Sequence, residues 1–333
     1  MAISDSSCPV HRQASFCAIS IAIAFLFVVC FSCLPLTHSL PFILLHGLGN
    51  ECDKEGMSMM TELLSNHSGQ EGFCIEVGNG IKDSWFKSMT TQVDSVCETV
   101  KSMSALESGY NIVALSQGGL IARAVIQWCE DGPPVNNLIS LGSPHAGTAS
   151  VPYCGNLFLE EDMESNTLSS EDAESKVMCS LANYLIELGV YTSYVQNHLG
   201  PAGYVKIPTD LKAYYKGCKF LPYLNNELED SRNTTYVERF TSLNQLILVK
   251  FESDNVLLPR ETAWFGYYTA GSLSSVLAYN ETDLYIEDWI GLRALDEAGK
   301  VNFLSLPRGH LQINETEMSS HIVPYLIDTS ALL

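Results

Sequence analysis

Tyr110-Asn-Ile-Val-Ala-Leu-Ser-Gln-Gly-Gly-Leu-Ile-Ala-Arg-Ala124 is the stretch that decides the fold of this chain. An apolar run typical of a buried strand ends at Ser116 and passes at once into a helix that starts with small residues. Such a sharp turn exposes a serine hydroxyl above a sheet, provided that the flanking positions are small. Gly118 fills one of these positions, and Ala114 stands where glycine is usual. The stretch predicts Ser116 as a nucleophile; an ordinary strand–turn–helix is the alternative.

Apolar runs of strand length recur on both sides of this turn, and they alternate with segments of helical spacing at residues 84–103 and 117–128. Strands of a parallel sheet are buried on both faces and read as continuous apolar runs. The predicted strands cover residues 40–45, 73–77, 111–115, 137–141, 246–251 and 301–306. The sequence therefore predicts an α/β-hydrolase fold over residues 40–333, with a mostly parallel sheet and helices on both faces.

Residues 150–240 interrupt this alternation. Residues 160–176 are acidic and rich in serine, which predicts an exposed loop, whereas residues 178–199 have helical character. The tyrosine-rich stretch 204–223 shows no clear period. Ligands of such sheets bind beyond the carboxyl ends of the strands. We interpret the region as an insertion of helices and loops over the catalytic end of the sheet.

The first 39 residues have the composition of a targeting segment. Residues 14–36 are almost wholly apolar and follow Arg12, and Thr37-His-Ser39 supplies small residues at the −3 and −1 positions of a cleavage site. This pattern predicts a secretory signal peptide over residues 1–39, and no stable membrane span once it is cleaved. Because the apolar run is long for a signal, an uncleaved anchor is the alternative.

Cysteines and glycosylation sequons agree with secretion. The seven cysteines after the signal are Cys52, Cys74, Cys97, Cys129, Cys154, Cys179 and Cys218. They lack zinc-finger spacing, and in an oxidising lumen they favour disulfides with at least one cysteine left over. Cys154 and Cys179 bracket the acidic loop and form a candidate pair. The predicted glycosylation sites are Asn66, Asn233, Asn280 and Asn314.

The charge of the chain excludes some partners. It has 38 acidic and 18 basic residues, and its formal net charge is −20. Such a surface repels nucleic acid and anionic membrane faces. Neither a Walker loop nor a His-Glu-x-x-His motif is present, and Gly47-Leu-Gly49 is too incomplete for a dinucleotide fingerprint. We therefore expect no cofactor, no metal and no nucleic-acid partner.

A nucleophilic serine needs a histidine base, and the histidine needs a carboxylate that fixes its tautomer. In this fold the chain order is serine, acid, histidine. His310 follows the last predicted strand behind the flexible Gly309, and Asp254 follows the strand at residues 246–251. These two residues are the predicted base and acid. The rivals are His198 and His321 for the base and Glu252 and Asp288 for the acid.

Two backbone N–H groups are predicted to form the oxyanion hole. One belongs to Gln117, the residue after the nucleophile, and the other to Leu48, in the loop that follows the first strand. We interpret His46 in this loop as a structural residue whose ring braces the loop. His145 receives the same structural interpretation.

An ordered set of motifs resembles the palmitoyl-protein thioesterases, lysosomal α/β-hydrolases that remove fatty acyl groups from S-acylated cysteines. The motifs are His46-Gly-Leu-Gly49, Gly109-Tyr-Asn111, Leu115-Ser-Gln-Gly-Gly119, Asn137-Leu-Ile-Ser140, Leu248-Val-Lys-Phe251, Pro259, Trp264-Phe-Gly-Tyr267, Gly299-Lys-Val-Asn-Phe303, Gly309-His-Leu-Gln312 and His321-Ile-Val-Pro324. The resemblance runs from about residue 40 to 326. It implies Ser116 as nucleophile, Asp254 as orienting acid and His310 as base.

The resemblance also implies a disulfide between Cys97 and Cys129. The chain departs from the family at Ala114, at the single Cys52 where the family has two neighbouring cysteines, and in the longer acidic stretch at residues 160–176. These departures leave the triad intact. They affect the acyl pocket and some of the disulfides.

The sequence predicts a serine hydrolase of long-chain acyl thioesters in the secretory pathway, in the lysosome or vacuole or outside the cell. Its expected substrates are S-acylated proteins or peptides and acyl thioesters. One alternative is a carboxylester or lipid acyl hydrolase with the same triad, and another is a catalytically silent lipid carrier. Residues 178–224 are expected to supply an acyl groove leading to Ser116. The candidate groove residues are Leu185, Leu188, Val190, Tyr191 and Tyr194.

Overall fold

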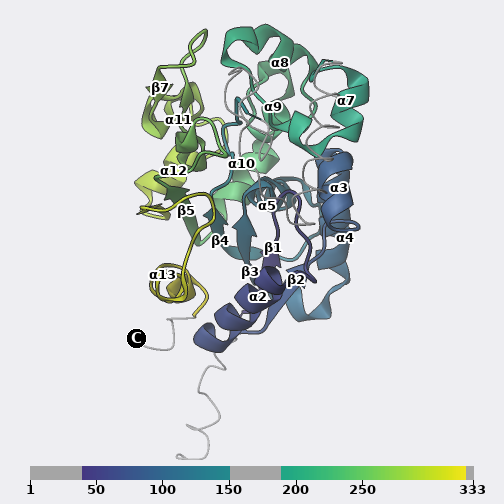
Figure 1. Ribbon diagram of the computed structural model, residues 1–333, viewed down its shortest axis with the longest axis vertical. Helices are drawn as coiled ribbons and strands as arrows, with labels where there is room; N and C mark the ends of the chain where they lie inside the picture. Colours follow the sequence, from purple (N-terminus) through teal and green to yellow (C-terminus); the bar gives the residue numbers. More distant parts are fainter. Residues whose placement is uncertain (1–39, 151–188, 328–333) are drawn as a thin grey trace, which may run out of the picture. The chain divides into compact units, whose positions relative to one another are not determined.

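Six strands form one parallel sheet in the computed structural model, which describes residues 40–150 and 189–327 (Figure 1). They are β1 (Phe42–Leu45), β2 (Gly72–Ile75), β3 (Tyr110–Leu115), β4 (Val135–Leu141), β5 (Gln245–Phe251) and β8 (Val301–Leu306). Their order across the sheet is β2-β1-β3-β4-β5-β8, and every neighbouring pair is parallel. The predicted sheet is therefore confirmed. A separate antiparallel pair joins β6 (Tyr267–Tyr268) to β7 (Val276–Leu277).

Alternation along the strands divides the core into two layers. In β1, Ile43 and Leu45 belong to one apolar cluster, whereas Phe42 and Leu44 belong to the other. Successive side chains of a strand point to opposite faces, so both faces of the sheet are apolar and both need a cover of helices.

Helices cover each face of the sheet. The α-helices of the described ranges are α2 (Glu55–Ser68), α3 (Ile81–Phe86), α4 (Met89–Ser102), α5 (Gln117–Trp128), α7 (Ser193–His198), α8 (Leu211–Gly217), α9 (Leu221–Leu224), α10 (Thr234–Thr241), α11 (Asp283–Ile286), α12 (Leu292–Glu297) and α13 (Glu315–His321). Helices α4, α5 and α10 contribute to the cluster that contains Ile43, and α2 and the segment after α13 contribute to the cluster that contains Phe42. The predicted two-sided cover is present.

The segment of helical spacing at residues 84–103 is helical over most of its length, but it forms two helices, because the chain breaks between α3 and α4. Ser88 is the N-cap of α4, and its Oγ accepts a hydrogen bond from the Thr91 N–H at 3.2 Å. The Gln92 side-chain amide donates to the carbonyls of Ser84 and Lys87, which satisfies acceptors at the end of α3. A serine cap with a nearby amide donor makes this break favourable, although the apolar stripe continues across it.

The predicted insertion is described only from residue 189 onward. The acidic loop at residues 160–176, Leu185 and Leu188 lie outside the described residues. Helix α7 ends the stretch predicted to be helical, and short helices α8 and α9 occupy the tyrosine-rich stretch. Val190 and Val195 pack with Leu48 and Trp85 in a third apolar cluster, so this part of the chain contacts the loop after β1.

Among the residues of the described ranges, no helix is both long and apolar enough to cross a membrane.

Candidate active site

Ser116 lies on a strained turn between β3 and α5. Its backbone φ is 51°, in a region that residues other than glycine rarely adopt. The turn brings the start of α5 against β1. A Cβ atom at Gly118 would lie 2.6 Å from the His46 carbonyl oxygen and 2.7 Å from that of Leu45, so only glycine fits at this position. The small residue that the sequence pattern requires is thus explained by a close backbone approach.

Ser116, His310 and Asp254 form one continuous line of contacts. His310 Nε2 lies 3.1 Å from Ser116 Oγ, and His310 Nδ1 lies 2.6 Å from Asp254 Oδ2. The side chains of His310 and Asp254 are 4% and 1% exposed, so water hardly screens their pairing. This is the geometry in which a histidine can take the serine proton while a carboxylate stabilises the resulting imidazolium.

Backbone hydrogen bonds hold the acid and the base on neighbouring strands. Asp254 follows β5 and His310 follows β8, and these strands pair from Leu246 to the last residue of each strand. The pairing continues into the loops, where the Ser253 N–H donates to the Arg308 carbonyl at 2.9 Å. Asp254 Oδ1 accepts the N–H groups of Val256 and Leu257 at 2.8 and 3.0 Å, which leaves Oδ2 for the imidazole.

The rival acids have other partners. Glu252 is bonded to Ser305 and lies 3.2 Å from Lys250 Nζ. Asp288 accepts the N–H groups of Arg293 and Ala294 at the start of α12, where a carboxylate is favoured.

The rival histidines also lie in other environments. His198 is exposed, stacks on Tyr194, and places its Nδ1 2.7 Å from the Tyr194 carbonyl oxygen. His321 is the last residue of α13. His310 is the histidine that contacts Ser116.

The loop after β1 lies directly beside the nucleophile. A Cβ atom at Gly47 would lie 3.2 Å from Ser116 Cβ, and Leu48 follows it in the chain. Within the described residues, the N–H groups of Leu48 and Gln117 donate no hydrogen bond to another group. Two free donors beside a serine hydroxyl are what a developing oxyanion requires.

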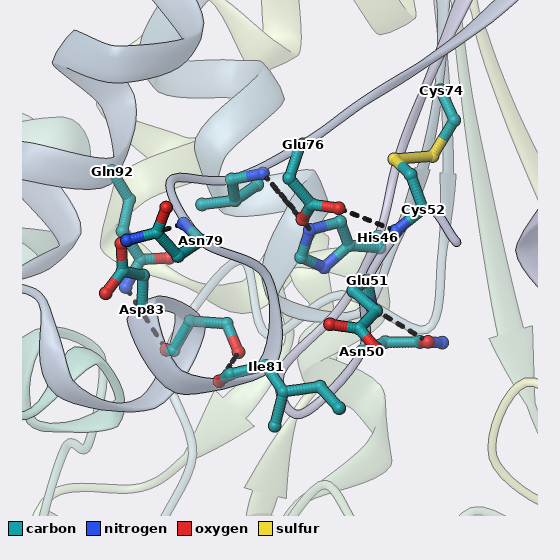
Figure 2. Close-up of polar contacts among 12 residues, drawn as sticks. His46, Asn50, Glu51, Cys52, Cys74, Glu76, Asn79, Ile81, Asp83 and Gln92 are labelled. Atoms are coloured by element: carbon teal, nitrogen blue, oxygen red, sulfur yellow. Dashed lines mark hydrogen bonds and ion pairs between the residues drawn. A yellow bond between two sulfur atoms is a disulfide. The ribbon is translucent and has the colours of Figure 1, made fainter. Parts of the chain in front are cut away.

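A single carboxylate holds both ends of this loop, as Figure 2 shows. Glu76 Oε1 lies 2.6 Å from His46 Nε2, and Glu76 Oε2 accepts the Cys52 N–H at 2.8 Å. The other ring nitrogen of His46 lies 2.9 Å from the Gly47 carbonyl oxygen. The structural interpretation of His46 agrees with these contacts. Glu76 is a partner that the sequence analysis missed, although a single charged residue inside a predicted apolar strand was a usable signal.

A disulfide between Cys52 and Cys74 ties the same loop to β2, with an S–S distance of 2.01 Å (Figure 2). The sequence analysis left the partner of Cys52 open. Cys74 lies within a strand predicted from the sequence, and this position was the available signal. The loop is also held from its other side, because the Gly49 N–H donates to Ser84 Oγ at 2.9 Å.

The side chain of Gln117 fixes the second candidate oxyanion donor. Its amide nitrogen donates to the Ser84 carbonyl and to Gln92 Oε1, each at 2.9 Å. Its amide oxygen accepts the Tyr204 hydroxyl at 2.8 Å. The buried polar groups are thus paired, and the first turn of α5 is locked against α3, α4 and the region of the predicted insertion. Sequence reasoning missed Gln92 and Tyr204, which give no motif signal.

A fully buried ionisable cluster lies along α5. The Arg123 guanidinium donates to the His145 carbonyl at 3.2 Å and to Asn225 Oδ1 at 2.6 Å. Burial lowers the pKa of Arg123 to about 9, although the charge of Glu227 opposes the shift. Burial and, secondarily, the charge of Arg123 hold the pKa of His145 well below 6.5. A neutral His145 that stacks on Phe265 and contacts Ser140 fits the structural interpretation.

The cysteines outside the loop fall into three groups. Cys97 and Cys129 form a disulfide that joins α4 to the end of α5, with an S–S distance of 1.95 Å. Cys154 and Cys179 lie outside the described residues, so their pairing stays a prediction. Cys218 is a free, buried thiol, and burial raises its pKa to about 12.

The predicted glycosylation sites lie at or near the surface. Asn66, Asn280 and Asn314 are exposed and Asn233 is half-buried. Asn233 and Asn314 also cap helices α10 and α13 through their side-chain oxygens. Glycosylation itself stays a prediction. No group of three or more histidine, cysteine or acidic side chains with the geometry of a metal site occurs in the part of the chain that the structure describes.

A pocket of about 790 Å³ lies in the region of the predicted insertion, and Val190, Tyr191, Ile207 and Cys218 are among its lining residues. Of the groove residues predicted from the sequence, Val190 and Tyr191 are in this lining. Tyr194 is exposed and stacks on His198 instead. Ser116 is not among the described residues that line the pocket.

The parallel sheet, the strained serine and the Ser–His–Asp contacts define an α/β-hydrolase with the arrangement of a serine hydrolase site. The sequence pattern of the palmitoyl protein thioesterase family matches residues 41–310. The chain belongs to this family.

Two relatives show how far the similarity extends. The chain is 33% identical to palmitoyl-protein thioesterase 1 of Caenorhabditis elegans, over 86% of this chain and 91% of that one. It is 32% identical to palmitoyl-protein thioesterase 3 of Dictyostelium discoideum, over 71% and 73% of the two chains. Among solved structures, Est1E from Butyrivibrio proteoclasticus aligns over 89% of this chain and 90% of its own, with 11% identity and a TM-score of 0.45.

Proposed function

We propose that this protein removes long-chain fatty acyl groups, palmitate among them, from S-acylated cysteines of proteins or peptides. Family membership supports the thioester class of substrate. The observation that supports Ser116 as the nucleophile is its 3.1 Å contact with His310 Nε2, together with the 2.6 Å contact of His310 with Asp254.

In the first half of the reaction, Ser116 Oγ attacks the acyl carbonyl carbon while His310 Nε2 takes the hydroxyl proton. The carbonyl oxygen becomes an oxyanion that accepts hydrogen bonds from the Leu48 and Gln117 N–H groups. Collapse of this intermediate breaks the carbon–sulfur bond, and the proton on His310 passes to the departing thiolate. An acyl-serine ester remains on Ser116.

In the second half, His310 takes a proton from water, and the hydroxide attacks the acyl-serine carbonyl. The carbon–oxygen bond to Ser116 breaks, the serine regains its proton from His310, and the fatty acid leaves. Asp254 stays in contact with His310 Nδ1 throughout and stabilises the imidazolium that forms in each half.

We place the protein in the lumen of the secretory pathway, in the lysosome or vacuole or outside the cell. Two disulfides within the described residues support an oxidising compartment. Relatives named lysosomal thioesterases, such as the 28% identical Drosophila melanogaster protein, support the same assignment.

Parallel assays of a palmitoyl thioester and its matched oxygen ester test the proposal. We expect the thioester to be the better substrate, Ser116→Ala to abolish both activities, and Ser58→Ala, an exposed helix serine, to retain both. Faster hydrolysis of the oxygen ester would favour the carboxylester alternative. Unchanged activity of Ser116→Ala would remove the proposed nucleophile.

A series of acyl lengths tests the long-chain preference. Each buried methylene contributes about 0.8 kcal/mol, so catalytic efficiency should rise from short to long chains. A polar substitution of Val190, which is buried beside the pocket, should flatten the rise and spare short-chain hydrolysis. An efficiency that already falls beyond short acyl groups would contradict a long-chain pocket.

A further inference from the structure

The region that starts at residue 189 differs in charge from the rest of the chain. Residues 189–223 contain four lysines and a single aspartate, whereas the whole chain has a net charge of −20. We call the exposed side chains of this stretch the cap face. Its lysines and tyrosines are Lys212, Lys216, Lys219, Tyr194, Tyr215 and Tyr223.

In the part of the chain that the structure describes, the exposed lysines of the cap face are not neutralised by ion pairs. Lys206, the fourth lysine of the stretch, is mostly buried and pairs with Glu227 at 3.1 Å. Within the described residues, Lys212 and Lys216 form no ion pair, and the Lys219 ammonium donates only to the neutral Asn197 side chain at 3.1 Å. The stretch therefore has an excess of positive charge on a strongly acidic protein. Asp210 is its one acid, and the Asp283 carboxylate of a neighbouring segment lies near Tyr215.

Exposed tyrosines accompany these lysines. Tyr194, Tyr215 and Tyr223 are all exposed, on or beside α7, α8 and α9. A tyrosine ring has an apolar body and a polar tip, and a lysine has an apolar stem and a charged tip. Both kinds of side chain suit the boundary between water and a lipid layer, where the tips contact headgroups and the bodies contact acyl chains.

The pocket of about 790 Å³ opens in the same place, since Lys216, Lys219 and Tyr223 belong to its lining. Its volume lies within the range of about 300–1,000 Å³ that is typical of small-molecule sites. Its lining also includes Val190, Ile207 and the buried Cys218, and Asp210 is its one acid; the larger part of the lining surface is apolar.

Helices α7, α8 and α9 lie together in the ribbon view, on the side of the sheet's helices that is farthest from α2 (Figure 1). Val190 and Val195 belong to the same apolar cluster as Leu48, whose N–H is a candidate oxyanion donor. Buried residues of the same stretch and the loop beside Ser116 thus share one apolar cluster.

We propose that the cap face docks on an anionic lipid surface and that the adjoining pocket accepts an apolar chain from it. The lysines select anionic headgroups, and the acidic remainder of the protein is repelled, so the charge distribution also orients the molecule. An acidic peptide would use the lysines alone. The exposed tyrosines and the apolar-walled pocket favour a lipid surface over such a peptide.

Vesicle binding by the full chain tests this inference independently of catalysis. The probes are vesicles of phosphatidylcholine mixed with phosphatidylserine, beside vesicles of phosphatidylcholine alone. We expect binding to the mixed vesicles that weakens as salt screens the charges. Lys212→Glu combined with Lys216→Glu should weaken it at least about tenfold. Lys82→Glu combined with Lys101→Glu makes the same charge change at exposed sites on α3 and α4 and should leave it within about twofold.

A second pair of variants keeps the test independent of the charge reversal. Tyr215→Ser combined with Tyr223→Ser should weaken vesicle binding at every salt concentration, and thermal melting checks that each variant is folded. Absence of binding to the mixed vesicles, equal losses in the two lysine pairs, or binding to a polyglutamate peptide in place of vesicles would overturn the inference. Because binding is measured without turnover, the inference and the proposed hydrolase activity fail separately.

Discussion

The two sides of Ser116 are held in different ways. On one side, His310 and Asp254 follow adjacent strands, and backbone hydrogen bonds continue from the sheet into their loops. On the other side, the loop that contains Leu48 is held by side chains, chiefly through the contacts of Glu76 with His46 and Cys52. The Glu76 side chain is 36% exposed, whereas His310 and Asp254 are nearly inaccessible.

This difference indicates where each side is vulnerable. The acid and base sit on a scaffold whose hydrogen bonds do not depend on side-chain identity, so only the acid and base themselves are irreplaceable there. The oxyanion side depends on side chains: the Glu76 carboxylate, the Cys52–Cys74 disulfide and the Ser84 hydroxyl. Their loss leaves the sheet intact but loosens the loop. We therefore expect substitutions in the triad to cause large losses of turnover. Substitutions of the residues that hold the loop should cause smaller losses, and substitutions elsewhere should cause still smaller ones.

The largest effect should come from the reacting groups. Ser116→Ala or His310→Ala should lower kcat by about 10⁴- to 10⁶-fold, because triad members act as a unit. Steady-state kinetics with a palmitoyl thioester measures the loss, and thermal melting should change little. Activity close to that of the natural chain in either variant would contradict the proposed mechanism.

Asp254→Asn should follow, with a loss of about 10⁴-fold in kcat, because the amide no longer fixes the imidazole tautomer. Glu252→Gln is the matched control, since this acid lies two residues away and is bonded to Ser305. A larger loss in Glu252→Gln than in Asp254→Asn would reverse the assignment of the acid.

Glu76→Gln should lower kcat by about 10- to 100-fold with little change in KM, because the oxyanion donor in the loop loses its position. Glu71→Gln, an exposed acid just before the same strand β2, should have no effect. If the two variants are equally active, Glu76 does not position the loop.

The two disulfides should differ in their effect on turnover, because only one of them holds the loop. Cys52→Ser combined with Cys74→Ser should lower turnover by less than about tenfold, because Glu76 still binds the Cys52 N–H. Cys97→Ser combined with Cys129→Ser removes a bond between α4 and α5, far from the loop in the chain. It should cost stability of about 3–4 kcal/mol without changing turnover at a temperature where the variant is folded. Urea unfolding and kinetics on both pairs would separate the effects; a turnover loss in the second pair alone would contradict the comparison.

The smallest effect on turnover, but a measurable one on stability, should come from His145. Its pKa lies well below 6.5 in the folded chain because it is buried, so the unfolded chain binds the proton first as the pH falls. Keeping His145 neutral therefore costs no free energy of unfolding above about pH 6.5. Below this pH the free energy of unfolding falls, by up to about 1.4 kcal/mol per pH unit. The stability of His145→Asn should depend less on pH between 6.5 and 5, whereas His198→Gln, at an exposed site, should behave like the natural chain. Parallel pH slopes in all three would show that His145 does not titrate in this way.

The sequence by itself determined the parallel sheet, the strained turn at Ser116 and the residues now found in contact with it. These features depend on local patterns: an apolar run, a small residue after the serine, and polar residues that follow strands. Chain order then indicated Asp254 and His310, because the carboxyl ends of parallel strands lie at the same edge of the sheet.

Only the tertiary structure decided how these groups are supported. Glu76, Gln92 and Tyr204 belong to separate segments, and no local pattern predicts which of their hydrogen bonds form once the segments pack. The pairing of Cys52 with Cys74 depends in the same way on the approach of a loop to β2. Even the break between α3 and α4 needed the Ser88 cap and the Gln92 amide, which outweighed a continuous apolar stripe. Long-range packing decides such contacts, because each one contributes little free energy until the sheet has brought its partners together.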